Sequence, residues 1–347
     1  MTARLFRTVL VMLIAVAMAV SCRGSAPPPA GWTTVAGYLV PWDTRSTALA
    51  DHGVLTEVSP VWYRPTESGE VVYASDEEQA VPNVEAEASA RGLRLMPTIS
   101  NSRHHRWDGA LVHAIINDPR TRSRHVAAIV DLVRSHGWAG IDVDYESLPA
   151  TAKDAYSGFV RDLAIALHAV HARLSVTLHA KTREPGSWRG AQAQDWRSIG
   201  ASADQVRVMA YDHATSDSSP GPIAPQGWVD EVLRFAVAAM PRGRVVLGLA
   251  TYGYDWPAGA PGTDLQWVDV QALAAARGAR QHWDATTQSP WLNYIDDHGR
   301  HHTVWFENAR SFALKLDTAR RYGIAGVVVW RLGGEDPGIW DALRSAR

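Results

Sequence analysis

Three acidic side chains spaced two residues apart are the strongest sign of chemistry in this sequence. Asp142, Asp144 and Glu146 alternate with large apolar residues in the segment Gly140–Glu146. Successive residues of a β-strand point to opposite faces, so the three carboxyls would share one face at intervals of about 6.5–7 Å. If that face is interior, burial and mutual repulsion raise the pKa of at least one carboxyl. The pattern therefore predicts a general acid that stays protonated near neutral pH.

The same acidic strand has two other interpretations, a carboxylate cage for a metal ion and a solvated edge strand. No His or further Asp nearby completes an evident ligand set. An edge strand would not need Ile, Val and Tyr side chains filling its other face. The histidine pairs at 104–105 and 301–302 also suggest a metal, but neighbours on a strand point in opposite directions. We therefore favour acid–base catalysis and expect no metal site.

Eight short apolar segments alternate with longer helical patterns along the chain, and one of them carries the three carboxyls. Most are rich in Val, Ile and Leu and are followed by Gly, Pro, Asn or Asp. Eight strand–helix units imply a parallel sheet closed into a (β/α)8 barrel. An open, doubly wound sheet is the alternative, although no Gly-x-Gly-x-x-Gly motif follows the first strand. The predicted strands are Thr34–Val40, Leu55–Tyr63, Leu93–Ile99, Gly140–Tyr145, Leu174–His179, Gln205–Tyr211, Val245–Thr251 and Gly326–Leu332.

The interval between the last two predicted strands, Tyr252–Ala325, is too long for one crossover helix. We expect a small α+β insertion at about residues 256–306, with a helix over Leu265–Ala276 and a β-hairpin that includes Trp283–Tyr294. The final barrel helix is predicted over Asn308–Tyr322. Loops at the carboxyl ends of barrel strands surround the active site, so this insertion should lie beside it.

The composition excludes several classes of protein. The chain has 347 residues, of which 46% are hydrophobic and 20% charged, enough for a large core and unlike a disordered chain. Its net charge of −2 shows no basic excess, so we expect no nucleic-acid partner. The single cysteine, Cys22, permits no intrachain disulfide. Fifteen tryptophans against five phenylalanines suit stacking on sugar rings, with core packing as the alternative.

The first residues have the pattern of a targeting segment. Arg4 and Arg7 precede Val9–Val20, an uncharged apolar run that is too short to span a bilayer and typical of a signal peptide. Small residues before Cys22 are typical of a bacterial lipoprotein signal, with plain secretion as the alternative. We therefore expect a signal peptide at 1–21, a tether at 22–31 and a catalytic barrel at 32–347. Lipid on Cys22 would anchor an extracellular protein to the outer face of the cytoplasmic membrane.

The acidic strand resembles the catalytic strand of glycoside hydrolase family 18, the chitinase-like hydrolases. The family signature is Asp-x-x-Asp-x-Asp-x-Glu at the end of the fourth barrel strand. Asp142, Asp144 and Glu146 match its last three acids, whereas Ala139 replaces the first. The replaced acid is the one furthest from the reaction, so we expect the replacement to affect the rate more than the existence of the activity.

Other segments match the same family in chain order. Gly37-Tyr38 resembles its first strand, Met209-Ala210-Tyr211-Asp212 its sixth and Trp330 the tryptophan of its eighth. The resemblance runs from Gly37 to Leu343 and is closest to the branch of spore-germination and spore-cortex N-acetylglucosaminidases. The sequence carries none of the peptidoglycan-binding repeats that members of that branch often have.

The resemblance implies a role for each catalytic residue. Glu146 would be the general acid and then the general base, and the substrate's own N-acetyl oxygen would attack the anomeric carbon. Asp144 would hold the acetamido N–H and stabilise the cyclised intermediate, while Asp142 would share a proton with Asp144. Tyr211 would donate its hydroxyl to the acetamido oxygen. Configuration would be retained, and no cofactor would be needed.

The resemblance also implies the binding residues and the substrate. Asp212 and Met209 would contact the reacting sugar, Trp330 would form the floor of its site, and Tyr38 would lie near the central Asp. Trp62 is a further candidate for a sugar contact because it lies near the catalytic end of its predicted strand, with core packing as the alternative. The substrate would be a β-linked N-acetylglucosaminide from chitin oligomers or peptidoglycan, and we expect the protein to act as a monomer. The alternative function is a non-catalytic, lectin-like protein on the same barrel. The natural glycan and endo or exo action stay open.

Overall fold

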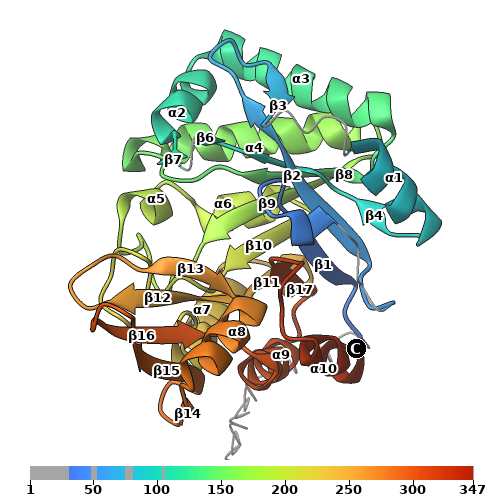
Figure 1. Ribbon diagram of the computed structural model, residues 1–347. Helices are drawn as coiled ribbons and strands as arrows, with labels where there is room; N and C mark the ends of the chain where they lie inside the picture. The colour runs from blue at the N-terminus through green and yellow to red at the C-terminus, as the bar shows by residue number, and fades with distance from the viewer. Residues whose placement is uncertain (1–30, 48–52, 75–80, 104–105, 347) are drawn as a thin grey trace, which may run out of the picture.

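A closed barrel of eight parallel strands forms the centre of the molecule (Figure 1). The computed structural model describes residues 31–47, 53–74, 81–103 and 106–346. Each barrel strand pairs with its neighbours in parallel, and β1 pairs with both β2 and β17, which closes the ring. This confirms the predicted (β/α)8 barrel. The strands in order are β1 (Thr34–Leu39), β2 (Glu57–Pro65), β5 (Thr98–Ser100), β8 (Gly140–Asp144), β9 (Arg173–His179), β10 (Gln205–Met209), β11 (Val245–Ala250) and β17 (Gly326–Trp330).

Two short strands extend the barrel wall beside β2. The third predicted strand is interrupted into β4 (Arg94–Leu95) and β5, and Pro97 lies in the interruption. Proline has no N–H to donate to a strand ladder, which explains the break. β3 (Val71–Tyr73) pairs antiparallel with the end of β2.

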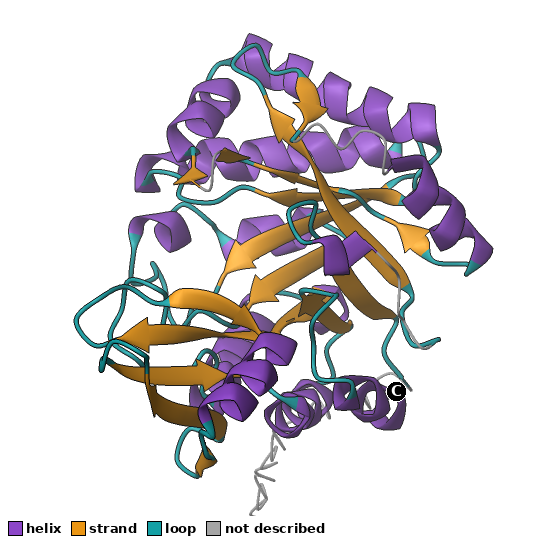
Figure 2. Cartoon of the chain, viewed as in Figure 1, coloured by secondary structure: helices purple, strands orange, loops and turns teal. Residues whose placement is uncertain are grey.

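Helices surround the barrel on its outer side (Figure 2). The longest, α3, begins after Asp118, whose carboxylate accepts hydrogen bonds from the N–H groups of Arg120 and Thr121. It ends at Gly137, which adopts a left-handed φ of 66° that glycine tolerates best. Within the described ranges, no helix combines the length and apolar character needed to cross a bilayer. The helices outside the insertion are α1 (Val81–Ala90), α2 (Gly109–Asn117), α3 (Pro119–His136), α4 (Lys153–His168), α5 (Arg189–Gln192), α6 (Trp196–Ser202), α7 (Gln226–Ala239), α9 (Ala309–Tyr322) and α10 (Gly338–Ala346).

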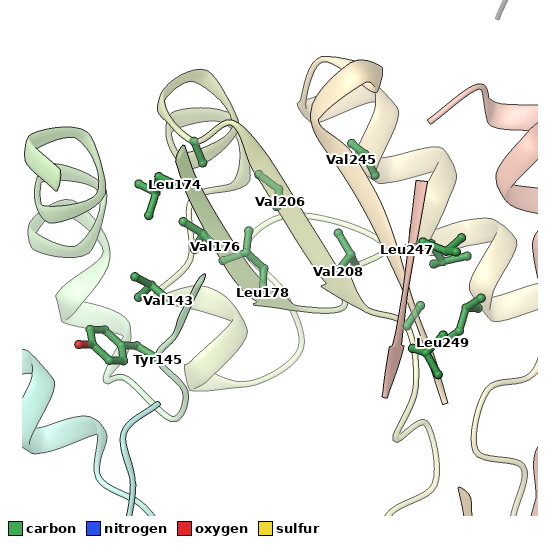
Figure 3. Close-up of a cluster of buried hydrophobic side chains, with 14 of the residues drawn as sticks. Val143, Tyr145, Leu174, Val176, Leu178, Val206, Val208, Val245, Leu247 and Leu249 are labelled. Carbon is green, nitrogen blue, oxygen red and sulfur yellow. The ribbon is translucent and has the colours of Figure 1, made fainter. Parts of the chain in front are cut away.

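The two faces of the barrel wall carry different chemistry. Outward-facing residues of neighbouring strands, such as Val143, Val176 and Val208, are fully buried in the hydrophobic core beneath the helices (Figure 3). The alternate residues of the same strands, Asp142 and Thr177 among them, belong to the polar interior. Strand alternation therefore brings carboxyl and hydroxyl groups inside while aliphatic groups pack outside.

The long interval after β11 folds into a five-stranded antiparallel sheet with one helix, drawn in orange and brown in Figure 1. The expected helix and hairpin are present, and two further strands precede the helix. These two strands pair with each other, and β12 also pairs with β16, about fifty residues later in the chain. The helix α8 packs on the sheet through a small core that includes Val270, Leu292 and Val304. The elements are β12 (Tyr252–Pro257), β13 (Thr263–Gln266), α8 (Trp267–Arg277), β14 (Gln281–Asp284), β15 (Ser289–Ile295) and β16 (His301–Phe306).

Candidate active site

A cavity of about 720 Å³ opens at the carboxyl ends of the barrel strands, where the acidic strand ends. Asp144 and Glu146 line it, and Asp142 lies beneath them in the barrel interior. Burial decreases along the strand: Asp142 is 0% exposed, Asp144 6%, and the Glu146 side chain 13%. The three carboxyls thus run from the sealed interior to the cavity surface, which leaves Glu146 the most accessible to a substrate.

Four side chains from four different strands hold Asp142. Tyr38 Oη and Thr98 Oγ1 each donate a hydrogen bond of 3.1 Å to Asp142 Oδ2, and Thr177 Oγ1 donates to both carboxylate oxygens. Arg207 Nη1 lies 3.4 Å from Asp142 Oδ2. Three hydroxyl donors and one cation compensate the buried carboxylate for its lost hydration.

Asp142, Asp144 and Glu146 are called the ladder below. Arg207 connects the ladder to Glu57, the first residue of β2. Its guanidinium forms an ion pair with Glu57 and donates to Ser59 Oγ at 2.8 Å. Arg207 and Glu57 are both sealed from solvent. Sequence reasoning missed this pair, although a single arginine in the apolar run Gln205–Met209 was a usable signal.

The surroundings of Asp144 and Glu146 favour their protonated forms. Burial raises the pKa of Asp144 well above its usual range, the charge of Asp142 adds to this, and Arg207 opposes it. Burial also raises the pKa of Glu146, and the nearby charges of Asp144 and Asp212 act in the same direction. The predicted raised carboxyl pKa is thus present at both positions. A protonated carboxyl at the cavity surface is suited to general acid catalysis.

The backbone of Glu146 is fixed by the side chain of Asn101, which directly follows the neighbouring strand β5. Asn101 Nδ2 donates to the Glu146 carbonyl at 2.9 Å, and the Glu146 N–H donates to Asn101 Oδ1 at 2.8 Å. This two-way bond anchors the residue just beyond the end of β8, where the regular ladder stops. Asn101 was not identified from the sequence.

Tyr211 and Asp212 follow the end of β10, which is separated from the acidic strand β8 by β9. The phenol of Tyr211 lines the cavity, and burial raises its pKa, so it remains a hydroxyl donor. Asp212 adopts a left-handed φ of 55° and accepts hydrogen bonds from Tyr252 and Tyr254 of the insertion, the latter at 3.0 Å. Burial raises the pKa of Asp212, and the two phenols oppose that shift. The insertion therefore holds an active-site carboxyl directly.

The remaining predicted binding residues divide into two groups. Tyr38, Met209 and Trp330 line the cavity, and the rings of Tyr38 and Trp330 meet edge to face with centroids 5.1 Å apart. Trp62 does not line it: its side chain is 6% exposed and packs against Trp138 in the core. The expectation of a sugar contact at Trp62 is corrected by this placement, because the outward face of β2 meets the helices.

Three further tryptophans line the cavity: Trp107, Trp188 and Trp228. Trp107 is 39% exposed and Trp188 43%, so flat aromatic surface is available beside the acids. Exposed tryptophan in a polar cavity suits stacking on sugar rings better than it suits core packing.

The structure also shows where the histidine pairs and Ala139 lie. In the described part of the chain, no three His, Cys, Asp or Glu residues are grouped to hold a metal ion. His302 is hydrogen-bonded to Asp255 at 2.8 Å within the insertion, whereas the pair at 104–105 lies outside the described residues. Ala139, in place of the first signature acid, precedes β8, and its backbone bonds to Leu95 and Arg173. It is not among the residues lining the cavity.

The amino-acid sequence is similar to those of bacterial proteins named as a glycosylase and as a cortical fragment-lytic enzyme. YdhD of Bacillus subtilis is 34% identical over 256 residues, which are 72% of this chain and 60% of YdhD. The cortical fragment-lytic enzyme of Bacillus subtilis is 31% identical over 263 residues, 74% of this chain and 61% of that enzyme. The chain therefore spans about 60% of the length of these two curated relatives.

Solved structures share the fold over nearly the whole described chain. A chitinase from Chromobacterium violaceum has a TM-score of 0.84 and 30% identity, covering 90% of this chain and 98% of its own. The spore cortex-lytic enzyme SleL of Bacillus cereus has a TM-score of 0.81 and 26% identity, covering 90% and 74%. The sequence profile of glycosyl hydrolases family 18 matches residues 34–335, from the first barrel strand to beyond the last. This chain therefore belongs to family 18 of the glycosyl hydrolases.

Proposed function

We propose that the protein hydrolyses β-linked N-acetylglucosaminides with retention of configuration, using the substrate's own acetamido oxygen as the nucleophile. The observation that carries the proposal is the position of Glu146, a carboxyl of raised pKa at the cavity surface, with Asp144 behind it. A raised pKa keeps the acid protonated near neutral pH, which the first chemical step requires.

The first step breaks the glycosidic bond. Glu146 donates its proton to the leaving oxygen while the acetamido oxygen attacks the anomeric carbon and forms a cyclic oxazolinium ion. In this step the proton shared by the two aspartates lies on Asp142, so the ionised Asp144 accepts a hydrogen bond from the acetamido N–H and offsets the positive charge that develops there. Tyr211 donates its hydroxyl to the acetamido oxygen and holds it in line for attack.

The second step reopens the ring with water. The ionised Glu146 accepts a proton from water as the water oxygen attacks the anomeric carbon from the face the leaving group vacated. The acetamido group is restored, and the sugar is released with its original configuration. Asp142 stays in the barrel interior, where its hydrogen bonds and its contact with Arg207 set the charge behind Asp144.

The substrate class follows from the acetamido requirement and from the cavity wall. A cleft of about 720 Å³ with tryptophans along its side is suited to an oligosaccharide. A relative named as a cortical fragment-lytic enzyme and a similar structure titled as a chitinase support peptidoglycan and chitin fragments as the two candidate glycans. We propose an N-acetylglucosamine-containing polysaccharide as the partner, with the protein acting as a monomer and without a cofactor.

We further propose that the protein is secreted and anchored by lipid on Cys22. The supporting pattern is the apolar run Val9–Val20 after Arg4 and Arg7, followed by small residues before the cysteine. These residues lie outside the described part of the chain. An outward-facing anchor would keep the barrel near cell-wall glycan.

The proposal is tested with a chromogenic chitobioside and with purified peptidoglycan and chitin oligomers digested side by side, followed by mass analysis. We expect release of the chromophore and retention of configuration by proton NMR. A thiazoline analogue of the cyclised sugar should inhibit strongly, because it resembles the intermediate. Efficient cleavage of a deacetylated substrate, or a covalent 2-fluoro-sugar label on Asp144, would overturn the mechanism. Tight binding of oligosaccharide without turnover would favour the lectin-like alternative.

A further inference from the structure

The carboxyl of Glu146 lacks a hydrogen-bonding partner even though its backbone is firmly held. Asn101 anchors the backbone through two hydrogen bonds. Among the described residues, the hydrogen bonds made by Glu146 involve its backbone and not its carboxyl. Nε2 of His179 lies 3.6 Å from Glu146 Oε2.

His179 is placed to serve this carboxyl. It is the last residue of β9, which pairs with the ladder strand β8. Its N–H donates to Gln194 Oε1 at 2.8 Å, and its ring meets Trp188 at 4.4 Å with a near-perpendicular tilt of 63°. His179 Nε2 is buried and has no hydrogen-bonding partner among the residues that the structure describes. Two groups with unmet hydrogen-bonding capacity therefore face each other at the cavity surface.

The imidazole at this position is uncharged. Burial lowers the pKa of His179 to about 3, and the charge of Lys181 acts in the same direction. A cation beside Glu146 would favour the ionised carboxyl and remove the acid needed for the first step. A neutral imidazole offers a hydrogen bond without that cost, which a lysine or arginine could not do.

The groups around Glu146 explain when that hydrogen bond is needed. Burial opposes its ionisation most, and the charges of Asp144, at the end of β8, and Asp212, after β10, act in the same direction. The ionised form, which exists between the two chemical steps, is therefore the poorly supported one. Nε2 of His179 is the atom that can offset this by donating, with Nδ1 left as the unprotonated nitrogen.

We propose that His179 is a positioning residue for Glu146, donating a hydrogen bond from Nε2–H to the carboxylate formed after proton transfer. The proposal rests on the proposed function, because it concerns the interval between the two steps. The 3.6 Å separation is slightly longer than a hydrogen bond, so a small rotation of the carboxyl closes it. Contacts of catalytic groups often tighten in this way when substrate binds.

The kinetic test compares His179→Leu, which fills the space without a donor, with His179→Gln, which keeps a neutral donor. In the leucine variant we expect kcat to fall about 10- to 100-fold with KM changed less than about threefold. The basic limb of its kcat/KM profile should move to higher pH, because Glu146 loses the donor that favours ionisation. The glutamine variant should recover most of the rate. His113→Leu, a half-buried histidine outside the cavity, is the control and should behave like the parent.

A second readout does not depend on turnover. The Glu146 carboxyl is titrated by carbon-13 NMR in the parent and both variants, with Glu146→Gln used to assign its signal. The pKa should be higher in His179→Leu than in the parent and lie closer to the parent in His179→Gln. An unchanged titration together with near-parental turnover would overturn the inference. So would a glutamine variant no better than leucine, since that would mean His179 only fills space. If no substrate is cleaved, the proposed function fails while the titration still decides the role of His179.

Discussion

Arg207 lies 3.4 Å from Asp142 in the sealed interior of the barrel, and the same guanidinium is paired with Glu57. The cation therefore stands between two buried carboxylates contributed by different strands. Burial is the main cause of the raised pKa of Asp144, the charge of Asp142 raises it further, and the charge of Arg207 opposes both. Arg207 therefore influences the protonation of Asp144 from the end of the ladder opposite the substrate.

This relationship predicts different effects for the two aspartates. Asp144→Asn should lower kcat by at least about 100-fold, because the intermediate loses its counter-charge. Asp142→Asn should act more mildly and move the limb of the pH–rate profile that reports Asp144 to lower pH, since a charge that raises that pKa is gone. Steady-state kinetics across pH checks both. An equal loss in the two variants, with no shift of the profile, would contradict the assignment.

Glu146→Gln should keep the fold and most of the sugar affinity but lose turnover. The amide matches the carboxyl in size and cannot donate an acid's proton, and such groups contribute about 10²–10⁴-fold. The measurement is kcat on a chromogenic chitobioside together with oligosaccharide binding by calorimetry. Glu87→Gln, on α1 and in an ion pair with Arg91 at the surface, is the control for removing a carboxylate. A loss of only two- or threefold would remove Glu146 from the role of general acid.

The raised pKa of Glu146 also predicts a pH-dependent gain in stability for Glu146→Gln. Between the usual pKa of 4.5 and the raised folded value, the native parent binds more protons than the unfolded chain. The parent's stability therefore falls as pH rises through that window. The variant lacks this titrating group, so its free energy of unfolding does not fall in the same window. The variant should therefore be no more stable than the parent below about pH 4, and more stable by on the order of 1–2 kcal/mol near neutrality. Denaturant unfolding at several pH values tests this, and a variant less stable than the parent at pH 7 would contradict it.

Tyr254→Phe should impair catalysis through Asp212. The change removes one of two phenols that donate to the same Asp212 oxygen, which raises the pKa of Asp212 further and loosens its orientation. We expect a kcat loss of about two- to tenfold and a stability loss of about 1 kcal/mol. Tyr294→Phe is the matched control, because that phenol donates to Asp255 within the same insertion but outside the cavity. Equal kinetics in the two variants would mean that the insertion does not position Asp212.

Cys22→Ser should move the protein from the membrane fraction to the soluble extracellular fraction. The acyl chains of a bacterial lipoprotein hold far more firmly than a single chain, so the difference should be large. Cell fractionation and mass spectrometry of the mature N-terminus provide the measurement. An unmodified N-terminus and an unchanged distribution would rule out the anchor.

Local alternation was sufficient to predict the barrel and its acidic strand. Carboxyls at Asp142, Asp144 and Glu146 share a face because side chains alternate along any strand, whatever its neighbours. The apolar partners in the same strand indicated which face meets the helices. Trp62 shows the limit of this reasoning, since residue type did not reveal whether its indole points to the cavity or to the core.

The fold class, the ladder of acids and the cavity-lining residues Tyr38, Tyr211 and Trp330 could be predicted from the order of residues along the chain. The contacts of Arg207 with Asp142, of Asn101 and His179 with Glu146, and of the insertion's tyrosines with Asp212 became visible in the folded protein. They could not be predicted because each of these contacts joins different strands or loops. Their geometry depends on barrel closure and on strand register, which local periodicity does not encode.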